Sequence, residues 1–411
     1  MKPFNLYLLG TGSWFLAFGI QSVMFAWLVT MNLGESPHRV GIAQMTMLVP
    51  TMLLILVGGS LADIVGGRRI VLVAQSVAVV PPLFLCIVLS TGNLTFRSMI
   101  CYAIVMGLAQ AFVTPARDGL LNQVAIGGIQ RAVVRASMMQ FGVQLAGLAI
   151  AALAEHLGPV PILLAQSLVL ASGVRFFALI ADRLPPRERD TRRLRDIGRS
   201  IAEGYRTIAA SPSMRMTVLQ SCAMGLCFMG SYIVTLPLLV REYYSGSAVD
   251  LAMMNAANSL GLVTTILFLI RFGDIARRGR ALLLAQGIGA VMLGAIGIGV
   301  NFATLCALIF VWGMGGGIAM SMARTIMQEE APANQRSRVM SFYSFAFMGS
   351  GPIGAFVNGY LAQWIGPRGA LALASAVMFA VIALIALRSQ LWHVDPRERN
   401  VTETSANVVA E

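Results

Sequence analysis

Charged residues divide the chain into long stretches that contain none. Eleven stretches free of Asp, Glu, Lys and Arg are each 18 to 43 residues long. A bilayer core of about 30 Å is crossed by about 20 apolar residues in a helix. Ten of the stretches fit one crossing each, and the eleventh, 281–323, has Asn301 near its middle and fits two. The pattern therefore predicts twelve membrane-spanning helices.

Composition supports lipid as the solvent of this chain. Of the 411 residues, 57% are hydrophobic and only 12% are charged, whereas about a quarter are charged in soluble domains. A buried helix of a soluble protein explains one or two apolar stretches, but not eleven in series. We therefore expect an all-α membrane protein. The first apolar stretch is long enough to span and has no cleavage site, so we expect it to be retained.

The basic residues predict an orientation. If the N-terminus is inside, 25 of the 30 basic residues lie in inside segments and one, Arg175, lies within a span. Outside loops then carry only Arg39, Arg97, Arg241 and Arg368. This positive-inside bias predicts that both termini are cytoplasmic. The net charge of +12 is thus a topology signal. Its scatter over several loops without interleaved aromatics argues against a nucleic-acid partner.

The sequence shows no arrangement typical of an enzyme, a metal site or a cofactor. The five cysteines lie within predicted spans without the spacing of metal ligands, and the three histidines lie in loops or the tail. No Gly-rich sequence ending in Gly-Lys-Ser/Thr is present, so ATP is not the expected direct fuel.

A charged segment separates the spans into two sets of six. Residues 182–215 contain nine arginines, and we interpret them as a cytoplasmic linker. It would join an N-terminal bundle, 1–181, to a C-terminal bundle, 216–391, with 392–411 as a cytoplasmic tail. Within the linker, about 192–209 is either a surface helix on the headgroups or a solvated connector.

The two sets repeat each other. The segment SLADIVGGRRIVLVAQ, 60–75, aligns with RFGDIARRGRALLLAQ, 271–286, and PARDGLL, 115–121, aligns with MARTIMQ, 322–328. Parallel halves related by an axis along the membrane normal place a binding site near the midplane. The alignment pairs Asp63 with Asp274, Arg69 with Arg280, Gln75 with Gln286, Arg117 with Arg324, and Gly147 with Gly351.

Over its whole length the chain resembles the major facilitator superfamily. Residues 59–69, GSLADIVGGRR, are similar to the family signature G-x-L-A-D-R-x-G-R-R, with departures at Ile64 and Gly67. The run TPAR, 114–117, is similar to the N-P-A-R run of a bacterial efflux branch that includes siderophore and macrolide exporters. The resemblance implies the major facilitator fold, with twelve transmembrane helices in two pseudo-symmetric six-helix bundles.

Asp63 is the part of this signature that topology alone does not explain. It lies on the last turn of helix two, where the helix dipole disfavours an anion. The resemblance implies a partner at the start of helix eleven, so we predict a latch between the halves, with an inert topology charge as the alternative. Arg117 and Arg324 are either gate residues or charges whose side chains snorkel to the membrane surface. We expect Gly59 to allow close helix approach, and Gly66 and Gly67 to supply the tight turn after it. The latch and gate candidates are Gly59, Asp63, Gly66, Arg68, Arg69, Arg117, Asp274, Arg278, Arg280, Arg324, Arg336 and Arg338.

Polar residues at mid-span are the candidates for lining a substrate cavity. The alternative for each Gln or Asn is an interhelical hydrogen bond. Arg175 is either an anion-binding or coupling residue or a snorkelling charge. The cavity candidates are Trp14, Gln21, Gln44, Gln140, Gln144, Arg175, Gln220, Tyr232, Asn255, Asn258 and Asn358.

Two observations bear on coupling. No Asp or Glu is placed deep in a predicted span, although such residues mark proton paths. The helix-five signature of antiporters, G-P-x-x-G-G, keeps only Gly147, while its repeat keeps Gly351, Pro352 and Gly354, which we expect to pack helices closely. Proton-exchange export is what the resemblance implies.

Together these patterns predict a monomeric secondary transporter of the bacterial inner membrane. Its expected partners are the lipid bilayer and a small amphiphilic substrate, such as a siderophore or a drug-like compound, moved outward with proton coupling. Two alternatives remain open: an importer of a polar nutrient, and a membrane sensor or scaffold that does not transport.

Overall fold

The fold is described by a computed structural model for residues 3–124, 129–180, 205–272, 275, 277–332 and 335–388. Eleven of its helices are long and apolar enough to cross a membrane. The last, α14 (Arg336–Arg388), is interrupted at Gly366, whose φ of 74° and ψ of 164° are not helical. Counting its two parts separately gives the twelve predicted crossings within the described residues.

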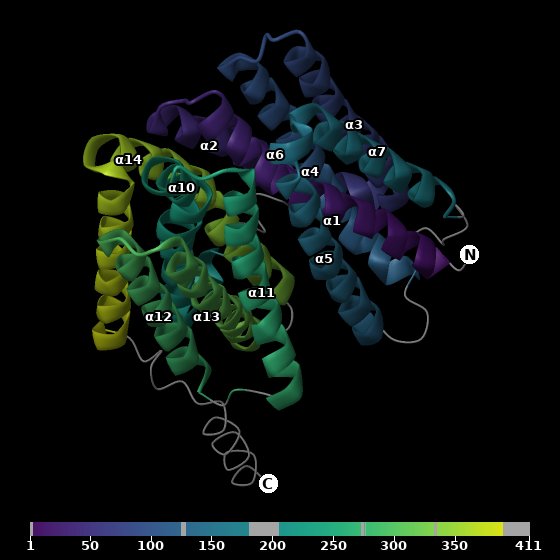
Figure 1. The fold of residues 1–411 in the computed structure, drawn as a ribbon. Helices are drawn as coiled ribbons and strands as arrows, with labels where there is room; N and C mark the ends of the chain where they lie inside the picture. The colour runs from purple at the N-terminus through teal and green to yellow at the C-terminus, as the bar shows by residue number, and fades with distance from the viewer. Residues whose placement is uncertain are drawn as a thin grey trace. The chain divides into compact units, whose positions relative to one another are not determined.

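The first six crossings are formed by α1 to α7, drawn from purple to teal in Figure 1. The first ends in a π-helix, η1, and the fifth continues into the short α6. Within this half α2 packs along α4, α1 packs along α5 and α7, and α3 packs along α4 and α7. The elements are α1 Pro3–Trp27, η1 Leu28–Asn32, α2 Pro37–Val65, α3 Gly67–Ser90, α4 Phe96–Val124, α5 Ile129–Ala152, α6 Ala154–Leu157 and α7 Pro159–Ala178.

The other six crossings are formed by α9 to α14. The seventh is assembled from two α-helices with two π-helices between them, and α12 packs along α13. The seventh crossing is thus π-helical in its middle and the first at its end, and π-helical turns are frequent at functional sites. The elements are α9 Pro212–Ala223, η2 Met224–Met229, η3 Ser231–Thr235, α10 Leu236–Tyr244, α11 Ala248–Phe272, α12 Arg278–Ile298, α13 Phe302–Glu330 and α14 Arg336–Arg388.

The stretch 281–323 is divided as predicted. The ninth crossing ends at Ile298, and Asn301 caps the start of the tenth by accepting a hydrogen bond from the Thr304 N–H at 2.8 Å. A side-chain oxygen at this position satisfies one of the N–H groups that the first turn of a helix leaves unpaired. A single polar residue therefore separates two crossings that no charge separates.

Two Gly-Pro turns occur at matching places in the two halves. Gly158 precedes Pro159 at the start of α7, and Gly366 precedes Pro367 at the break in α14. Both glycines have positive φ, 81° and 74°, a region that other residues rarely adopt. The proline then begins the next helix with a φ that is already suitable. The repeat therefore extends to how consecutive helices are joined.

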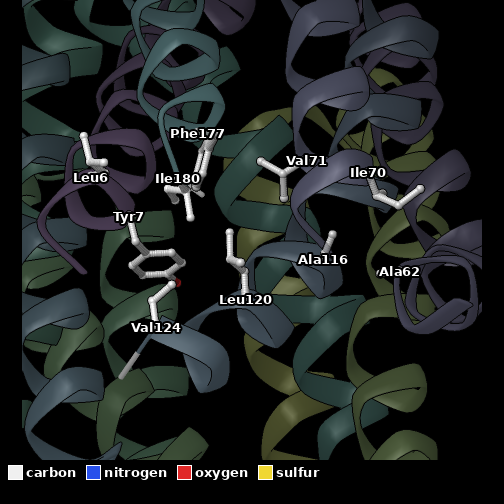
Figure 2. Packing of buried hydrophobic residues seen from close by; sticks show 10 residues of the cluster. All are labelled: Leu6, Tyr7, Ala62, Ile70, Val71, Ala116, Leu120, Val124, Phe177 and Ile180. Atoms are coloured by element: carbon white, nitrogen blue, oxygen red, sulfur yellow. The ribbon is translucent and has the colours of Figure 1, made fainter. Parts of the chain in front are cut away.

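One end of the first bundle is closed by an apolar cluster. Tyr7 of α1, Leu120 and Val124 of α4, and Phe177 at the end of α7 are all buried in it (Figure 2). Tyr7 and Phe177 meet edge to face, with ring centroids 6.3 Å apart. The cluster joins the ends of helices that are far apart in the sequence.

The chain forms two compact units. The first comprises 1–191, 230–256 and 351–367, and the second comprises the remaining segments. The predicted linker 182–215 lies mostly outside the described residues, and the tail 392–411 lies wholly outside them. The domain limits given in the sequence analysis therefore stay predictions.

Candidate functional site

The signature turn between α2 and α3 forms at the predicted glycine. Gly66 has a φ of 102° and ends α2, and α3 begins at Gly67. Arg68 donates from Nε to the Phe177 carbonyl at 3.2 Å and from Nη2 to the Ala178 carbonyl at 2.7 Å. These are among the last carbonyls of α7, which have no partner within the helix. Arg68 thus binds two helix ends of its own half together.

The second copy of the signature behaves in the same way. Arg278 forms an ion pair with Glu329 near the end of α13, and both residues belong to the second half. Arg69 is exposed and Arg280 is half-buried. The residues on which the predicted latch depends lie outside what the structure describes: Asp274 as a whole, and the side chains of Asp63, Arg336 and Arg338.

The close approach expected at Gly59 is made by its neighbours. A Cβ on Gly59 would lie 3.7 Å from Pro115 Cβ, which is an ordinary contact. A Cβ on Gly58 would lie 2.5 Å from the Ala111 carbonyl oxygen, and one on Gly67 would lie 2.7 Å from that of Ala116. The prediction for Gly59 was therefore wrong, because it is Gly58 whose Cα–H side faces α4.

Glycines bring helices into close contact in both halves, through the predicted Gly147 in the first and through Gly230, which was not predicted, in the second. A Cβ on Gly147 of α5 would lie 2.3 Å from the Leu16 carbonyl oxygen of α1. In the second half, a Cβ on Gly230 would lie 2.5 Å from the Gly354 carbonyl oxygen of α14. The helix of α14 continues through Pro352, with Gly351 buried beside it. The first and fifth helices of each bundle thus approach through glycine.

Several cavity candidates are buried and bonded to neighbouring helices. The Gln21 amide donates to Met47 Sδ at 3.1 Å, and the Gln220 amide donates to Gln286 Oε1. Asn358 Oδ1 accepts from Ser231 Oγ at 3.1 Å and from Thr235 Oγ1 at 3.2 Å. These side chains make the interhelical bonds that were the alternative to a cavity role.

One pair of cavity candidates is bonded to each other. Tyr232 of η3 donates its hydroxyl to Asn255 Oδ1 at 2.8 Å, and the Asn255 amide donates to the Leu251 carbonyl. Trp14 is 5% exposed. The candidates that are half-buried are Gln44, Gln140, Gln144, Tyr232 and Asn258.

Two arginines lie where the sequence did not place them. Arg175, predicted within a span, is exposed in the last turn of α7, which favours the snorkelling interpretation. Arg117, predicted at a helix end, lies seven residues before the end of α4 and is 7% exposed. Burial excludes snorkelling for Arg117, whereas its repeat partner Arg324 is exposed.

Arg241 is a contact residue that sequence analysis missed. It lies on α10 and donates from Nη1 to the Thr30 carbonyl at 3.0 Å and to the Glu35 carbonyl at 2.7 Å, across the loop between α1 and α2. Close by, a Cβ on Gly41 of α2 would lie 2.9 Å from the Cα of Gly359 in α14. On this side the first compact unit therefore joins helices of both halves. Nothing in the sequence distinguished Arg241 from the other loop arginines.

A comparison of the sequence with family models identifies its relatives. A model that describes transmembrane secretion effectors matches residues 8–410. The chain belongs to this family. It is a membrane transporter of the major facilitator type, which agrees with its twelve crossings and their repeat. A search of curated protein sequences finds no significant match to it.

Solved structures show the same fold at low identity. A variant of the nucleoside transporter NupG has a TM-score of 0.76 at 10% identity, covering 95% of this chain and 100% of its own. The human organic anion transporter MFSD10 (TETRAN) has a TM-score of 0.68 at 15% identity, covering 93% and 99%. A POT family transporter in complex with 5-aminolevulinic acid has a TM-score of 0.72 at 11% identity, covering 95% and 96%. These likenesses establish the fold and leave the substrate open.

Proposed function

We propose that this secretion effector exports a small amphiphilic molecule, such as a siderophore or a drug-like compound, by alternating access. The observation that carries the proposal is the match of nearly the whole chain to transmembrane secretion effectors, in a fold of two repeated six-helix bundles. In such folds the bundles rock around a site near the midplane. The family description supports this direction, since a secreted solute moves out of the cell.

The first helix supports an amphiphilic substrate. Trp14, Phe18, Gln21 and Phe25 follow one another at intervals of three or four residues along α1, so they share a face. Aromatic rings with a few polar groups between them suit a solute with an apolar body and polar ends. Which members of this set contact the solute remains part of the proposal.

Proton exchange is the proposed energy source, since no ATP-binding sequence is present. One coupled proton gains about 2.3 kcal/mol per 100 mV of membrane potential, which sustains a gradient of tens-fold. We propose that the protein is a monomer in the bacterial inner membrane, and the distribution of its arginines supports cytoplasmic termini.

The proposed latch depends on Asp63. Its proposed partner is the start of α14, whose first turn contains Arg336 and Arg338 and offers free N–H groups to an anion. A partly buried pair of this kind contributes up to about 2 kcal/mol, enough to bias two conformers. Asp63→Asn should therefore cut export while the chain still inserts, with Glu155→Gln, an exposed acid on α6, as the control. Wild-type export in Asp63→Asn contradicts the latch.

Export is tested directly in cells that lack the gene and are supplied with it on a plasmid. Cells are loaded with fluorescent amphiphilic dyes, and dye retention is followed with and without a protonophore. We expect the protein to lower retention, and the protonophore to abolish the difference. Higher retention with the protein would instead indicate import. Equal retention for dyes and for labelled siderophores would contradict transport of this solute class.

A further inference from the structure

Arg117 is a buried charge in the membrane-spanning part of the first bundle. It is 7% exposed, and among side chains that the structure describes it is the only charged one that is buried. Its neighbour in the sequence, Asp118, has a side chain that is 66% exposed. Charged side chains inside a membrane are costly, and those that persist usually mark the path of a substrate or an ion.

The guanidinium lies against the first crossing, inside the bundle. Its central carbon is 4.5 Å from the centroid of the Phe15 ring. Arg117 belongs to the candidate span Phe96–Leu121, four residues before its end, and Phe15 belongs to the candidate span Pro3–Asn32. The charge is therefore held between two membrane-spanning helices, and charges in such a place usually face the bundle interior or a water-filled cavity.

The hydrogen bonds of Arg117 are incomplete. Nε and Nη2 reach one oxygen of Asp118 at 3.4 and 3.3 Å, which are long for a charge-assisted pair. Nη1 is buried and has no hydrogen-bond partner. A buried donor left unpaired costs free energy, so the guanidinium is poised to take a stronger acceptor than Asp118.

The surroundings of Arg117 suit the rest of an amphiphile. Tyr7, Thr11 and Phe15 lie four residues apart along α1 and share a face. The Arg117 charge is close enough to act on the Tyr7 hydroxyl. Beyond Tyr7, toward the helix ends, the apolar cluster with Leu120 and Val124 closes the bundle (Figure 2). The face thus combines one cation and hydroxyl donors with aromatic surface.

Comparison of the two halves distinguishes a binding role for Arg117 from that of a charge that only orients the chain. Arg324, which aligns with Arg117, is exposed near the end of α13, as expected for a charge that only orients the chain. Burial of Arg117 is therefore a property of the first half alone.

We propose that Arg117 binds the anionic group of the transported molecule, an amphiphilic organic anion such as a carboxylate or a sulfonate. That the bound anion is also the transported solute rests on the proposed function. Nη1 and the edge now turned to Asp118 supply a two-pronged donor to two oxygens, while Phe15 and its neighbours contact the apolar body. Because Nη1 is covered in this conformation, the anion enters when the side chains around it move, as the transport cycle requires.

The test measures binding to the purified full-length protein with three probes of the same shape and different charge. The probes are 2-naphthoate, the neutral 2-naphthamide and the cationic 2-naphthylmethylammonium, and the readout is calorimetry together with the thermal unfolding midpoint. We expect the wild type to bind naphthoate in preference to both others. Equal binding of the three, no binding of naphthoate, or preference for the cation overturns the proposal without any variant.

Variants of Arg117 then test whether this side chain causes the preference for the anionic probe. Arg117→Gln should weaken naphthoate binding roughly ten- to hundredfold and leave the amide unchanged. Arg117→Lys keeps the charge but not the fork, so it should retain part of the preference. Arg324→Gln is the matched control and should bind naphthoate like the wild type. Folding of each variant is checked by monodispersity, and an undiminished preference for the anion in Arg117→Gln overturns the assignment.

The outcome is separable from that of the proposed function. Naphthoate binding that depends on Arg117, together with absence of dye export from cells, would contradict export and keep the site. Export that shows no preference for anionic over neutral amphiphiles, and no loss in Arg117→Gln, would keep the function and contradict the site.

Discussion

Gln75 in the first bundle and Gln286 in the second occupy matching positions of the repeat, and both are buried. Gln75 donates to Ser13 of α1 at 3.1 Å and to the Leu170 carbonyl of α7 at 3.0 Å. Gln286 accepts from Gln220 of α9. In each half the third helix is thus bonded to the first by the same amide, so the repeat preserves a packing contact.

Arg117 and Arg324 also align with each other in the repeat, but unlike the two glutamines they differ in the structure. The first is buried against Phe15 and the second is exposed. Packing contacts are preserved because both halves need the same helix arrangement. A buried charge is weak support for that arrangement, so the burial of Arg117 in one half alone agrees with the proposed binding role.

The largest effects are expected where glycines let helices touch. Gly107→Ala, between the second and fourth crossings of the first half, and Gly313→Ala, between the matching crossings of the second half, each place a methyl group within 2.4 Å of a backbone carbonyl oxygen. Overpacking of this kind costs about 1–3 kcal/mol, so both variants should lower the thermal unfolding midpoint by similar amounts. The controls are Gly119→Ala and Gly316→Ala on the same two helices, where a Cβ meets nothing within 4 Å. A large loss in one half only would mean that the packing is not repeated.

Arg241 tests an asymmetry outside the core of the bundles. The matching end of the first crossing, η1, has no charged residue, whereas Arg241 joins α10 to the α1–α2 loop through two carbonyls. Its side chain is 22% exposed. We therefore expect Arg241→Gln to weaken the contact between α10 and the α1–α2 loop by about 2 kcal/mol. Spin labels at Asn32→Cys and Ser245→Cys should then show a new, longer distance.

The control for Arg241 is Arg39→Gln. Arg39 is 52% exposed and pairs with Glu35 one helical turn away, so its loss should leave the label distance unchanged. If Arg241→Gln also leaves it unchanged, Arg241 does not hold this side of the protein together.

We expect the buried Arg117 to destabilise the fold relative to an apolar side chain. Replacing a buried charge by an apolar side chain of similar length is often stabilising, by about 1 kcal/mol or more. We therefore expect Arg117→Met to raise the thermal unfolding midpoint while it abolishes binding of 2-naphthoate, and Arg324→Met to change stability by less than about 0.5 kcal/mol. A lower midpoint for Arg117→Met would indicate that the guanidinium supports the fold, which weakens the case for a ligand.

The number of crossings was predictable because lipid excludes charge. The charge-free stretches, the break at Asn301 and the turn at Gly66 were all confirmed. The same rule misplaced Arg117, because a stretch that ended at the first charge was taken as the end of the span. In fact α4 continues to Val124, so one arginine is inside the helix rather than at its end.

Which face of each helix is buried was not predictable. A helix that is apolar on all sides shows no periodicity that distinguishes lipid from protein, so Gly59 was chosen where Gly58 makes the close contact. For the same reason the sequence left Gln21, Gln220 and Asn358 open between a cavity and an interhelical bond. Arg241 was missed because its acceptors are backbone carbonyls, which have no signal in the sequence.

The smallest effect is expected for the two buried glutamines, Gln75 and Gln286. An interhelical hydrogen bond in a membrane contributes about 0.6 kcal/mol on average, because the separated helices find other partners. Gln75→Leu removes two such bonds and should cost about 1 kcal/mol, while Gln286→Leu removes its bond to Gln220 and should cost somewhat less. Thermal unfolding of the double variant distinguishes two situations. If the two halves unfold as independent bundles, the losses add. A combined loss clearly different from the sum would mean that these repeated contacts are coupled, and that the similarity of the halves reflects one cooperative structure rather than two.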